Sequence, residues 1–344
     1  MGPPVEVVAA VIRRHDDAIL IALRRPDQHQ GNLWEFPGGK LRPREASLTA
    51  LARELEEELG IRIESAQCRP LVRLEHAYPD KHIRLDVSEV FAWTGEARGR
   101  EGQRIAWVWP AELAGHPFPE ANLRIVQAAL LPRVCLITPE PEAGREPQFL
   151  RALAHGLAAG IRLVQLRIRS RPLETLTALV TDAVALCHGA GARVLLNVGA
   201  VAADSLDARW NLCALSKADG IHLPSSLLHQ DAFDASLRPA GKWVSAACHD
   251  VLELRAAESA GVDFVFLGTV LPSASHPGSA GLGWARAAEL AGSSRLPVFA
   301  LGGQHAGTVN AALEAGFHGI AAIRGFWDEV STIPDARLRP SPAR

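Results

Sequence analysis

Glutamates between residues 39 and 61 are the side chains of this sequence best suited to chemistry. Glu54, Glu57 and Glu58 stand three and four positions apart, so on a helix they share one face. Like charges at this spacing repel each other and destabilise a helix that stands alone. Hard cations such as Mg²⁺ take oxygen ligands, and water and substrate phosphates complete their coordination. The spacing therefore predicts a carboxylate site for Mg²⁺, with Mn²⁺ as the alternative ion.

Apolar residues of the same stretch predict the helix that positions these carboxylates. They recur at steps of three and four, which is typical of a helix with one buried stripe. The stripe consists of Leu48, Leu51, Ala52, Leu55 and Leu59. The preceding turn contains Gly38 and Gly39. Glycine lets the backbone approach an ion closely, because it has no Cβ.

The spacing of these residues resembles the Nudix box. Gly39, five residues, Glu45, seven residues and then the run 53–61 (RELEEELGI) match that motif at every fixed position. The alternative is a solvated acidic helix face, which is the usual role of a charge run. A spaced match over the full length of the motif is more specific than a lone glycine pattern.

Within the Nudix superfamily, residues 5–130 are similar to the MutT-type pyrophosphohydrolases, which remove the mutagenic nucleotide 8-oxo-dGTP from the nucleotide pool. Besides the box, the resemblance includes Arg24 with Asp27 and His29, and the runs 35–40, 78–82, 101–103 and 118–122. It implies an α/β/α sandwich with a mixed sheet. Carried over by position, the family's metal ligands fall on the Gly38 carbonyl, Glu54, Glu57, Glu58 and Glu101.

The same resemblance assigns base recognition to Arg24, Phe36 and Asn122. Tyr78 and Lys81 stand where the family often has Phe and Arg, and either pair can flank a base. Phe36 offers an apolar stacking surface, and Asn122 offers a donor and an acceptor for a purine edge. Two alternatives stay open: Phe36 as a core aromatic, and Asn122 as the N-cap of a helix over residues 123–130.

The chemistry implied by this family is attack of water at the β-phosphorus, which gives a nucleoside monophosphate and pyrophosphate. Phosphoryl transfer depends mainly on positioning and on neutralising the phosphate charge. Either Glu54 or Glu101 can deprotonate the water, and the sequence does not choose between them. We expect Arg53 to orient the glutamates through charge-assisted hydrogen bonds.

Short apolar segments predict the framework of the first domain, residues 1–131. Residues 5–12 and 18–23 flank a polar turn and predict a hairpin. Residues 68–76 and 82–93 predict two further strands. We expect an α/β fold with a mixed sheet and helices packed against it.

From Arg133 onward, short apolar strands alternate with amphipathic helices. The predicted strands are 134–138, 163–167, 194–197, 220–223, 243–247, 264–268, 298–302 and 319–323. This rhythm predicts a (βα)8 TIM barrel over residues 132–330, with its site at the C-terminal ends of the strands. Polar residues cluster at those ends, namely Gln165, Arg167, Asn197, His249, Ser275, His276, Gly302, Gly303 and Arg324. Residues 331–344 are expected to form a disordered tail.

The second half resembles the thiamine-phosphate synthase and TenI family over residues 134–326. Both magnesium carboxylates of the synthase are replaced, one at Val198 and one at Leu227. Arg169, His276 and Arg324 stand where the synthase has Lys, Lys and Ser. Without those carboxylates nothing neutralises a pyrophosphate leaving group, so we expect no synthase activity.

His249 stands where the metal-free TenI-type thiazole tautomerases place a histidine, and imidazole is a natural proton shuttle. A tautomerase barrel would accompany a hydrolase that acts on thiamine-related pyrophosphates. A structural histidine is the alternative. The barrel would then be non-catalytic, either supporting the first domain or regulating it by binding a phosphorylated ligand through Gly302, Gly303 and Arg324.

Composition sets the remaining limits. The chain has 344 residues, of which 48% are hydrophobic and 22% charged. A net charge of −2 and a pI near 6.7 give no electrostatic footprint for duplex nucleic acid or a membrane surface. The cysteines are odd in number, scattered and without CxxC spacing, which indicates reduced thiols. We expect a soluble cytoplasmic protein whose substrate is a nucleoside triphosphate.

Overall fold

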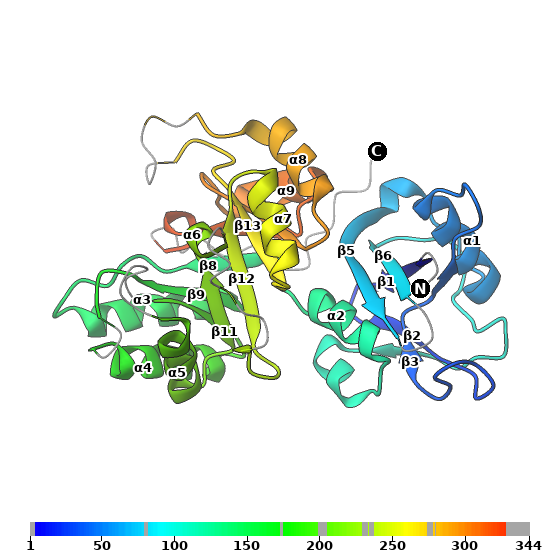
Figure 1. Ribbon diagram of the computed structural model, residues 1–344, viewed down its shortest axis with the longest axis horizontal. Helices are drawn as coiled ribbons and strands as arrows, with labels where there is room; N and C mark the ends of the chain where they lie inside the picture. Colours follow the sequence, from blue (N-terminus) through cyan, green and yellow to red (C-terminus); the bar gives the residue numbers. More distant parts are fainter. Residues whose placement is uncertain are drawn as a thin grey trace. The chain divides into compact units, whose positions relative to one another are not determined.

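The computed structural model describes residues 4–78, 82–172, 175–198, 205–228, 233, 237–273, 278 and 280–327. The chain divides into two compact units, Met1–Leu131 and Pro132–Arg344 (Figure 1). Within the described residues, no helix has the length and apolarity needed to span a membrane.

The first unit contains two sheets. The mixed sheet has the order β4 (Gly38–Lys40), β1 (Val5–Ile12), β6 (His82–Val90), β5 (Cys68–Ala77). Strands β1 and β6 run parallel, and the other pairs are antiparallel. The second, antiparallel sheet consists of β3 (Trp34–Glu35), β2 (Ile19–Leu23) and β7 (Ile105–Val108). Helices α1 (Ser47–Leu59) and α2 (Glu120–Ala129) contact the mixed sheet through β4 and β5 respectively.

The predicted hairpin between residues 5–12 and 18–23 is wrong. In the described part of the chain, β1 and β2 are joined by one bridge, Arg13 to Ile19, and then enter different sheets. The reason is that β2 is buried on both faces. Ile19 and Ile21 pack into one core cluster, while Leu20 packs into the other, beside α1. A strand buried on both sides lies between two cores rather than on one solvent-facing hairpin.

The predicted acidic helix is confirmed as α1. Leu51, Leu55 and Leu59 are fully buried at steps of four, as expected. Leu48 is 40% exposed, so its predicted place in the stripe is wrong, and Ala50 is buried instead. The helix ends at Gly60, whose φ of 73° is left-handed and suits a residue without a Cβ.

The second unit is a closed parallel barrel, as predicted. Its strands are β8 (Val134–Ile137), β9 (Leu163–Ile168), β10 (Arg193–Val198), β11 (Gly220–Leu223), β12 (Trp243–Cys248), β13 (Phe264–Gly268), β14 (Val298–Leu301) and β15 (Gly319–Ala322). Each strand pairs in parallel with the next, and β15 closes the barrel onto β8. The described helices of this unit are α3 (Glu146–Ala158), α4 (Thr177–Gly189), α5 (Leu206–Ser216), α6 (Ser225–Leu228), α7 (Val251–Ser259), α8 (Gly283–Ser293), α9 (Val309–Glu314) and α10 (Arg324–Trp327). They lie around the strands in Figure 1.

Aromatic rings fill part of the barrel. Phe299 contacts both Phe264 and Phe266, with ring centroids 5.5 and 5.4 Å apart. His222 lies beside Phe266, is only 4% exposed, and contacts the Ser245 hydroxyl through Nδ1 at 2.9 Å. Burial and the nearby positive charge of Arg169 lower the pKa of His222 to about 3.

The buried His222 predicts a stability loss in acid. An unfolded histidine titrates near pH 6.5, so between about pH 6.5 and 3 the unfolded chain binds the extra proton. The stabilisation that comes from the neutral, buried His222 is complete above about pH 6.5 and is lost as the pH falls. We expect the wild-type barrel to lose about 2 kcal/mol of unfolding free energy between pH 7.5 and 5, relative to His222→Gln. Denaturant unfolding of both proteins at the two pH values measures this difference, and equal losses would contradict it.

Candidate functional site

Two predicted carboxylates of α1 face the glycine strand β4. The Glu54 carboxylate lies directly against Gly39, since a Cβ added there would come within 2.2 Å of the carboxyl carbon. The Glu58 Oε2 accepts a hydrogen bond from the Gly38 N–H at 3.3 Å. Glycine is therefore needed at residue 39 to leave room for Glu54.

Arg53 contacts three glutamates from one position on α1. It donates to Glu45 at 2.8 and 2.9 Å, to Glu54 at 2.6 Å and to Glu57 at 3.3 Å. These hydrogen bonds, with that to Glu45 the largest effect, raise the pKa of Arg53. In turn, the Arg53 hydrogen bond lowers the pKa of Glu45 to about 2. Glu45 and Arg53 thus stay ionised, and the arginine restrains the Glu54 and Glu57 carboxylates.

Glu58 lies at the centre of the negative charge. Burial, followed by the charges of Glu35, Glu101 and Glu54, raises its pKa to about 8, against a lowering hydrogen bond from Gly38. Glu101 reaches this position from the loop between β6 and β7, although its sequence surroundings suggest an ordinary solvated residue. The fold therefore brings Glu54 and Glu101 within electrostatic reach of Glu58.

The side chains that could ligate a metal here have the chemistry that a hard cation requires. All of these side-chain donors are carboxylate oxygens, and they stand beside a glycine backbone. Glu57 differs, because its carboxylate turns toward Arg42 and Arg53, both at 3.3 Å. Across the described ranges, no three His, Cys, Asp or Glu side chains converge closely enough to hold an ion. A divalent cation would offset the charges of Glu35, Glu101 and Glu54, which add to the effect of burial on the pKa of Glu58.

The predicted base-recognition residue Arg24 is paired with Glu35, which links it to the carboxylates. Its Nη1 donates to Glu35 Oε2 at 2.7 Å. Burial raises the pKa of Glu35, and Arg24 opposes that rise. The Arg24 Nε is buried and has no hydrogen-bond partner in the described chain. A ligand acceptor at this atom would satisfy it. Sequence reasoning missed Glu35 as a partner, although it stands beside Phe36 in the motif.

Phe36 is a core residue, 3% exposed, and its ring stacks on Phe118 at 5.5 Å. Asn122 is half-buried, and its Oδ1 accepts from the Phe36 N–H at 3.5 Å. The alternative that made Asn122 a helix N-cap is wrong, because α2 begins at Glu120 and is preceded by Pro119. Proline suits the start of a helix, because the backbone N–H that it lacks has no partner within the helix there.

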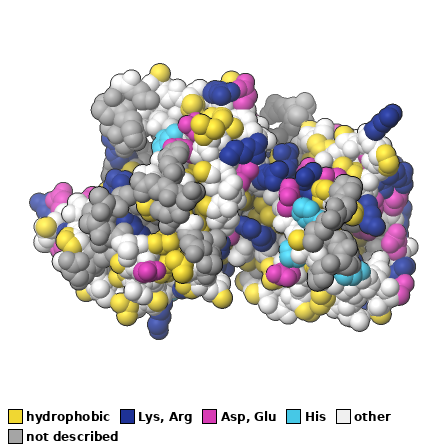
Figure 2. Space-filling model, viewed as in Figure 1, with side chains coloured by type: hydrophobic (Ala, Val, Ile, Leu, Met, Phe, Trp, Pro, Cys, Tyr) yellow, Lys and Arg dark blue, Asp and Glu magenta, His cyan; other side chains and the backbone are white. Residues whose placement is uncertain are grey.

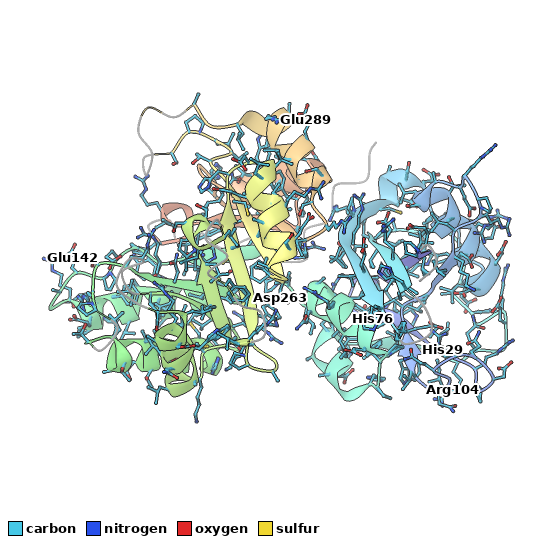
Figure 3. The ribbon with its side chains drawn as sticks, in the orientation of Figure 1. His29, His76, Arg104, Glu142, Asp263 and Glu289 are labelled. Atoms are coloured by element: carbon cyan, nitrogen blue, oxygen red, sulfur yellow. The ribbon has the colours of Figure 1, made fainter. Side chains whose placement is uncertain are left out.

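Tyr78 packs between two histidines beside the same core cluster. Its ring centroid lies 4.3 Å from that of His76 and 5.8 Å from that of His29. Figure 3 labels these two histidines on one side of the unit, and histidine side chains gather on the face shown in Figure 2. The predicted partner Lys81 lies outside the described residues.

The polar residues predicted at the strand ends of the barrel surround one cavity of about 910 Å³. Its lining includes Gln165, Arg167, Asn197, His249, Gly302, Gly303 and Arg324. Ser275 and His276 lie outside the described residues. Asn197 Nδ2 donates to Gln165 Oε1 at 3.0 Å, so a neutral amide pair occupies the end of these two strands.

Glu253 holds His249 at the mouth of this cavity. The Glu253 carboxylate accepts from the His249 backbone N–H at 2.6 Å and contacts its Nδ1 at 2.8 Å. Glu253 is 8% exposed, whereas the His249 side chain is exposed to solvent. A carboxylate at Nδ1 makes that nitrogen the donor and leaves Nε2 available. Sequence reasoning missed Glu253, although its place four residues after His249 was a usable signal.

Glu140 was also missed, and no local pattern marked it. Its carboxylate accepts from the backbone N–H groups of Arg169 and Ser170 at 3.0 Å and from the Ser170 hydroxyl at 2.6 Å. It also lies 3.6 Å from Arg167. Two successive N–H groups and an arginine form an anion-binding surface, and the chain fills it with its own carboxylate.

Comparisons with known proteins match each unit separately. A family model described as "NUDIX domain" matches residues 8–128, and one described as "Thiamine monophosphate synthase" matches residues 134–326. The 8-oxo-dGTP diphosphatase of Escherichia coli K12 is 36% identical over 121 residues, which is 35% of this chain and 92% of that protein. The CTP pyrophosphohydrolase of the same organism is 36% identical over 124 residues, 36% of this chain and 90% of that protein.

The second unit is similar to the thiamine-phosphate synthase of Thiobacillus denitrificans. The two are 31% identical over 207 residues, covering 58% of this chain and 86% of that protein. The chain therefore belongs to the Nudix hydrolases through its first unit and to the thiamine monophosphate synthase/TenI family through its second.

Proposed function

We propose that the first unit is a Mg²⁺-dependent nucleoside triphosphate pyrophosphohydrolase that converts 8-oxo-dGTP to 8-oxo-dGMP and pyrophosphate. The observation that carries the proposal is that Glu54 and Glu58 face the glycines of β4 while Glu101 lies within electrostatic reach of Glu58. Such a cluster is unfavourable by itself and suits a cation with its phosphate ligand. By removing an oxidised nucleotide, the enzyme would prevent mutation.

Glu54, Glu57, Glu58, Glu101 and the Gly38 carbonyl would hold the cation. When bound, it neutralises charge on the non-bridging phosphate oxygens. Arg53 restrains Glu54 and Glu57 so that their carboxylates keep one orientation. Glu54 or Glu101 accepts the proton of the attacking water.

Base selection would use the polar atoms around Phe36. Asn122 can exchange its long contact with the Phe36 N–H for hydrogen bonds to a purine edge. Arg24 offers its buried, unpaired Nε to a ring oxygen or a phosphate. Of the relatives, two are named for different nucleotides, 8-oxo-dGTP and CTP, so the base is the point to test.

A panel of nucleotides tests the hydrolase. We expect kcat/KM for 8-oxo-dGTP to exceed that for dGTP by about 10- to 100-fold, the effect of one or two discriminating hydrogen bonds. CTP and thiamine-type pyrophosphates should be poorer still. Glu57→Gln should lower every rate by about 100-fold, because one charged ligand is lost. Equal rates on dGTP and 8-oxo-dGTP would remove the sanitising assignment.

Gly39→Ala tests the position of Glu54 without removing it. The added Cβ would come within 2.2 Å of the Glu54 carboxyl carbon, and this flexible side chain can turn away. We expect kcat to fall by about 100-fold, since misplacement by about 1 Å has effects of this size. The unfolding temperature should stay close to that of wild type.

The matched control is Gly115→Ala, because a Cβ on Gly115 meets no atom within 4 Å. It should change neither the rate nor the stability. Wild-type activity in a folded Gly39→Ala protein would show that Glu54 does not act from its observed position.

For the barrel, the His249–Glu253 pair favours a metal-free proton shuttle of the thiazole tautomerase type. The neutral Asn197–Gln165 pair and the Glu140 carboxylate do not favour synthase chemistry, because neither neutralises a pyrophosphate. The second candidate is a regulatory module. Its phosphorylated ligand would bind at Gly302, Gly303 and Arg324 and change the kinetics of nucleotide hydrolysis. Unchanged kinetics with such a ligand bound would exclude the regulatory module.

Isomerisation of a thiazole phosphate tests the first barrel function. We expect His249→Ala to lower its rate by about 100-fold or more, since the proton shuttle is removed. Glu253→Gln should lower it less and shift the pH profile, because the carboxylate no longer fixes the Nδ1 proton. His155→Ala, an exposed histidine on α3, is the control and should match wild type. No isomerisation by the wild-type protein would contradict the tautomerase.

We propose that the protein is cytoplasmic. Cys135, Cys187, Cys213 and Cys248 are free and buried, and Cys68 is free and half-buried. Burial raises the pKa of the Cys68 thiol to about 11. Unreactive free thiols of this kind suit a reducing compartment.

A further inference from the structure

The loop that carries Glu101 is fastened to the C-terminal end of α1. The last carbonyl groups of a helix have no partners within it and must find them elsewhere. The Arg98 N–H donates to the Leu59 carbonyl at 3.0 Å, and the Arg100 N–H donates to the Glu58 carbonyl at 2.8 Å. The loop therefore supplies the donors that the end of this helix needs.

Gln103 adds a second connection through its side chain. Its Oε1 accepts from the Glu101 N–H at 2.8 Å, and its Nε2 donates to the Glu58 carbonyl at 3.1 Å. One amide thus joins the backbones of two residues whose carboxylates repel each other. The reverse orientation of the amide would set donor against donor and acceptor against acceptor, so the two contacts fix the side chain.

The loop is tight enough for this connection because residue 99 is glycine. A Cβ on Gly99 would come within 2.0 Å of the Gln103 carbonyl oxygen. The chain can thus fold back between Gly99 and Gln103 and return the Gln103 side chain to α1.

We propose that Gln103 is a positioning residue that fixes Glu101 relative to Glu58 and so sets the affinity of the first unit for a divalent cation. It acts through the backbones of the two glutamates and touches no reacting atom. The backbone bonds of Arg98 and Arg100 would still hold the start of the loop, but without this amide the repelled Glu101 would relax away from Glu58. Cation binding would then have to bring Glu101 back. The inference rests on the proposed hydrolase function.

Binding of Mn²⁺ alone, followed by the electron paramagnetic resonance signal of the free ion, tests the inference without relying on activity. Gln103→Met keeps the volume of the side chain and removes both hydrogen bonds. We expect its Kd for Mn²⁺ to rise about 10-fold, as for other residues that orient metal ligands. At limiting Mg²⁺, kcat for 8-oxo-dGTP should fall about 10-fold, while KM changes by less than about 2-fold.

Gln67→Met is the matched control. The Gln67 Oε1 also accepts from a backbone N–H, that of Glu64 at 3.0 Å, but in the turn Ser65–Gln67, where no predicted ligand takes part. This variant should bind Mn²⁺ and hydrolyse the nucleotide as wild type does.

Wild-type Mn²⁺ affinity and kcat in a folded Gln103→Met protein would overturn the inference. If that variant does not fold, Gln103→Asn replaces it, because its amide is polar but one methylene too short to span both backbones. The same losses are expected, and wild-type values would again overturn the proposal. A wild-type protein that neither binds Mn²⁺ nor hydrolyses any nucleotide would overturn the hydrolase as well, which distinguishes the two failures.

Discussion

Repulsion between carboxylates is the constraint around which the first unit is built. Glu54 and Glu101 oppose ionisation of the buried Glu58, and Glu35, although paired with Arg24, opposes it as well. The fold holds them by different means. Arg53 restrains the exposed side of the cluster, the glycines of β4 leave room for the carboxylates, and the loop after β6 shares hydrogen bonds with the end of α1. The stability of the hydrophobic core below α1 keeps these unfavourable charges together.

The barrel differs from the first unit in its electrostatics, because arginines rather than glutamates line its cavity. Its cavity is lined by Arg167, Arg169 and Arg324, but much of the polar surface is already paired. Asn197 is bonded to Gln165, His249 to Glu253, and Glu140 to the N–H groups after β9. Members of two enzyme families thus stand on one chain, one with an acidic cluster and one with a cavity whose polar side chains are partly paired.

The pattern of apolar residues predicted the helices and strands well, but not which strands pair with each other. The period of the apolar residues identified α1 and every strand of the barrel, because buried stripes and short apolar runs follow directly from helix and strand geometry. The pairing of β1 and β2 could not be predicted in this way, since periodicity carries no information about which strand lies beside which. Leu48 also shows the limit, because an apolar residue at the edge of a stripe is not always covered.

The same division holds for the site. Spacing along one helix predicted that Glu54, Glu57 and Glu58 act together, but only Glu54 and Glu58 face β4. Glu101 could be added only through the family resemblance. Glu35 and Gln103 were missed as partners, because their roles depend on contacts between segments that are distant in sequence or on backbone atoms. Side-chain to backbone contacts between separate segments leave no trace in residue spacing.

Glu140 has a consequence for any ligand of the barrel. The chain already provides the anion that the N–H groups of Arg169 and Ser170 attract, so these two donors after β9 are already occupied. An incoming phosphate gains little there unless it displaces a tethered carboxylate, whose effective concentration is high. The glycine pair after β14, together with Arg324, is the part of the rim where a free anion meets no internal competitor of this kind among the described residues. The donors after β9 and those after β14 and β15 therefore differ in whether the chain itself already occupies them.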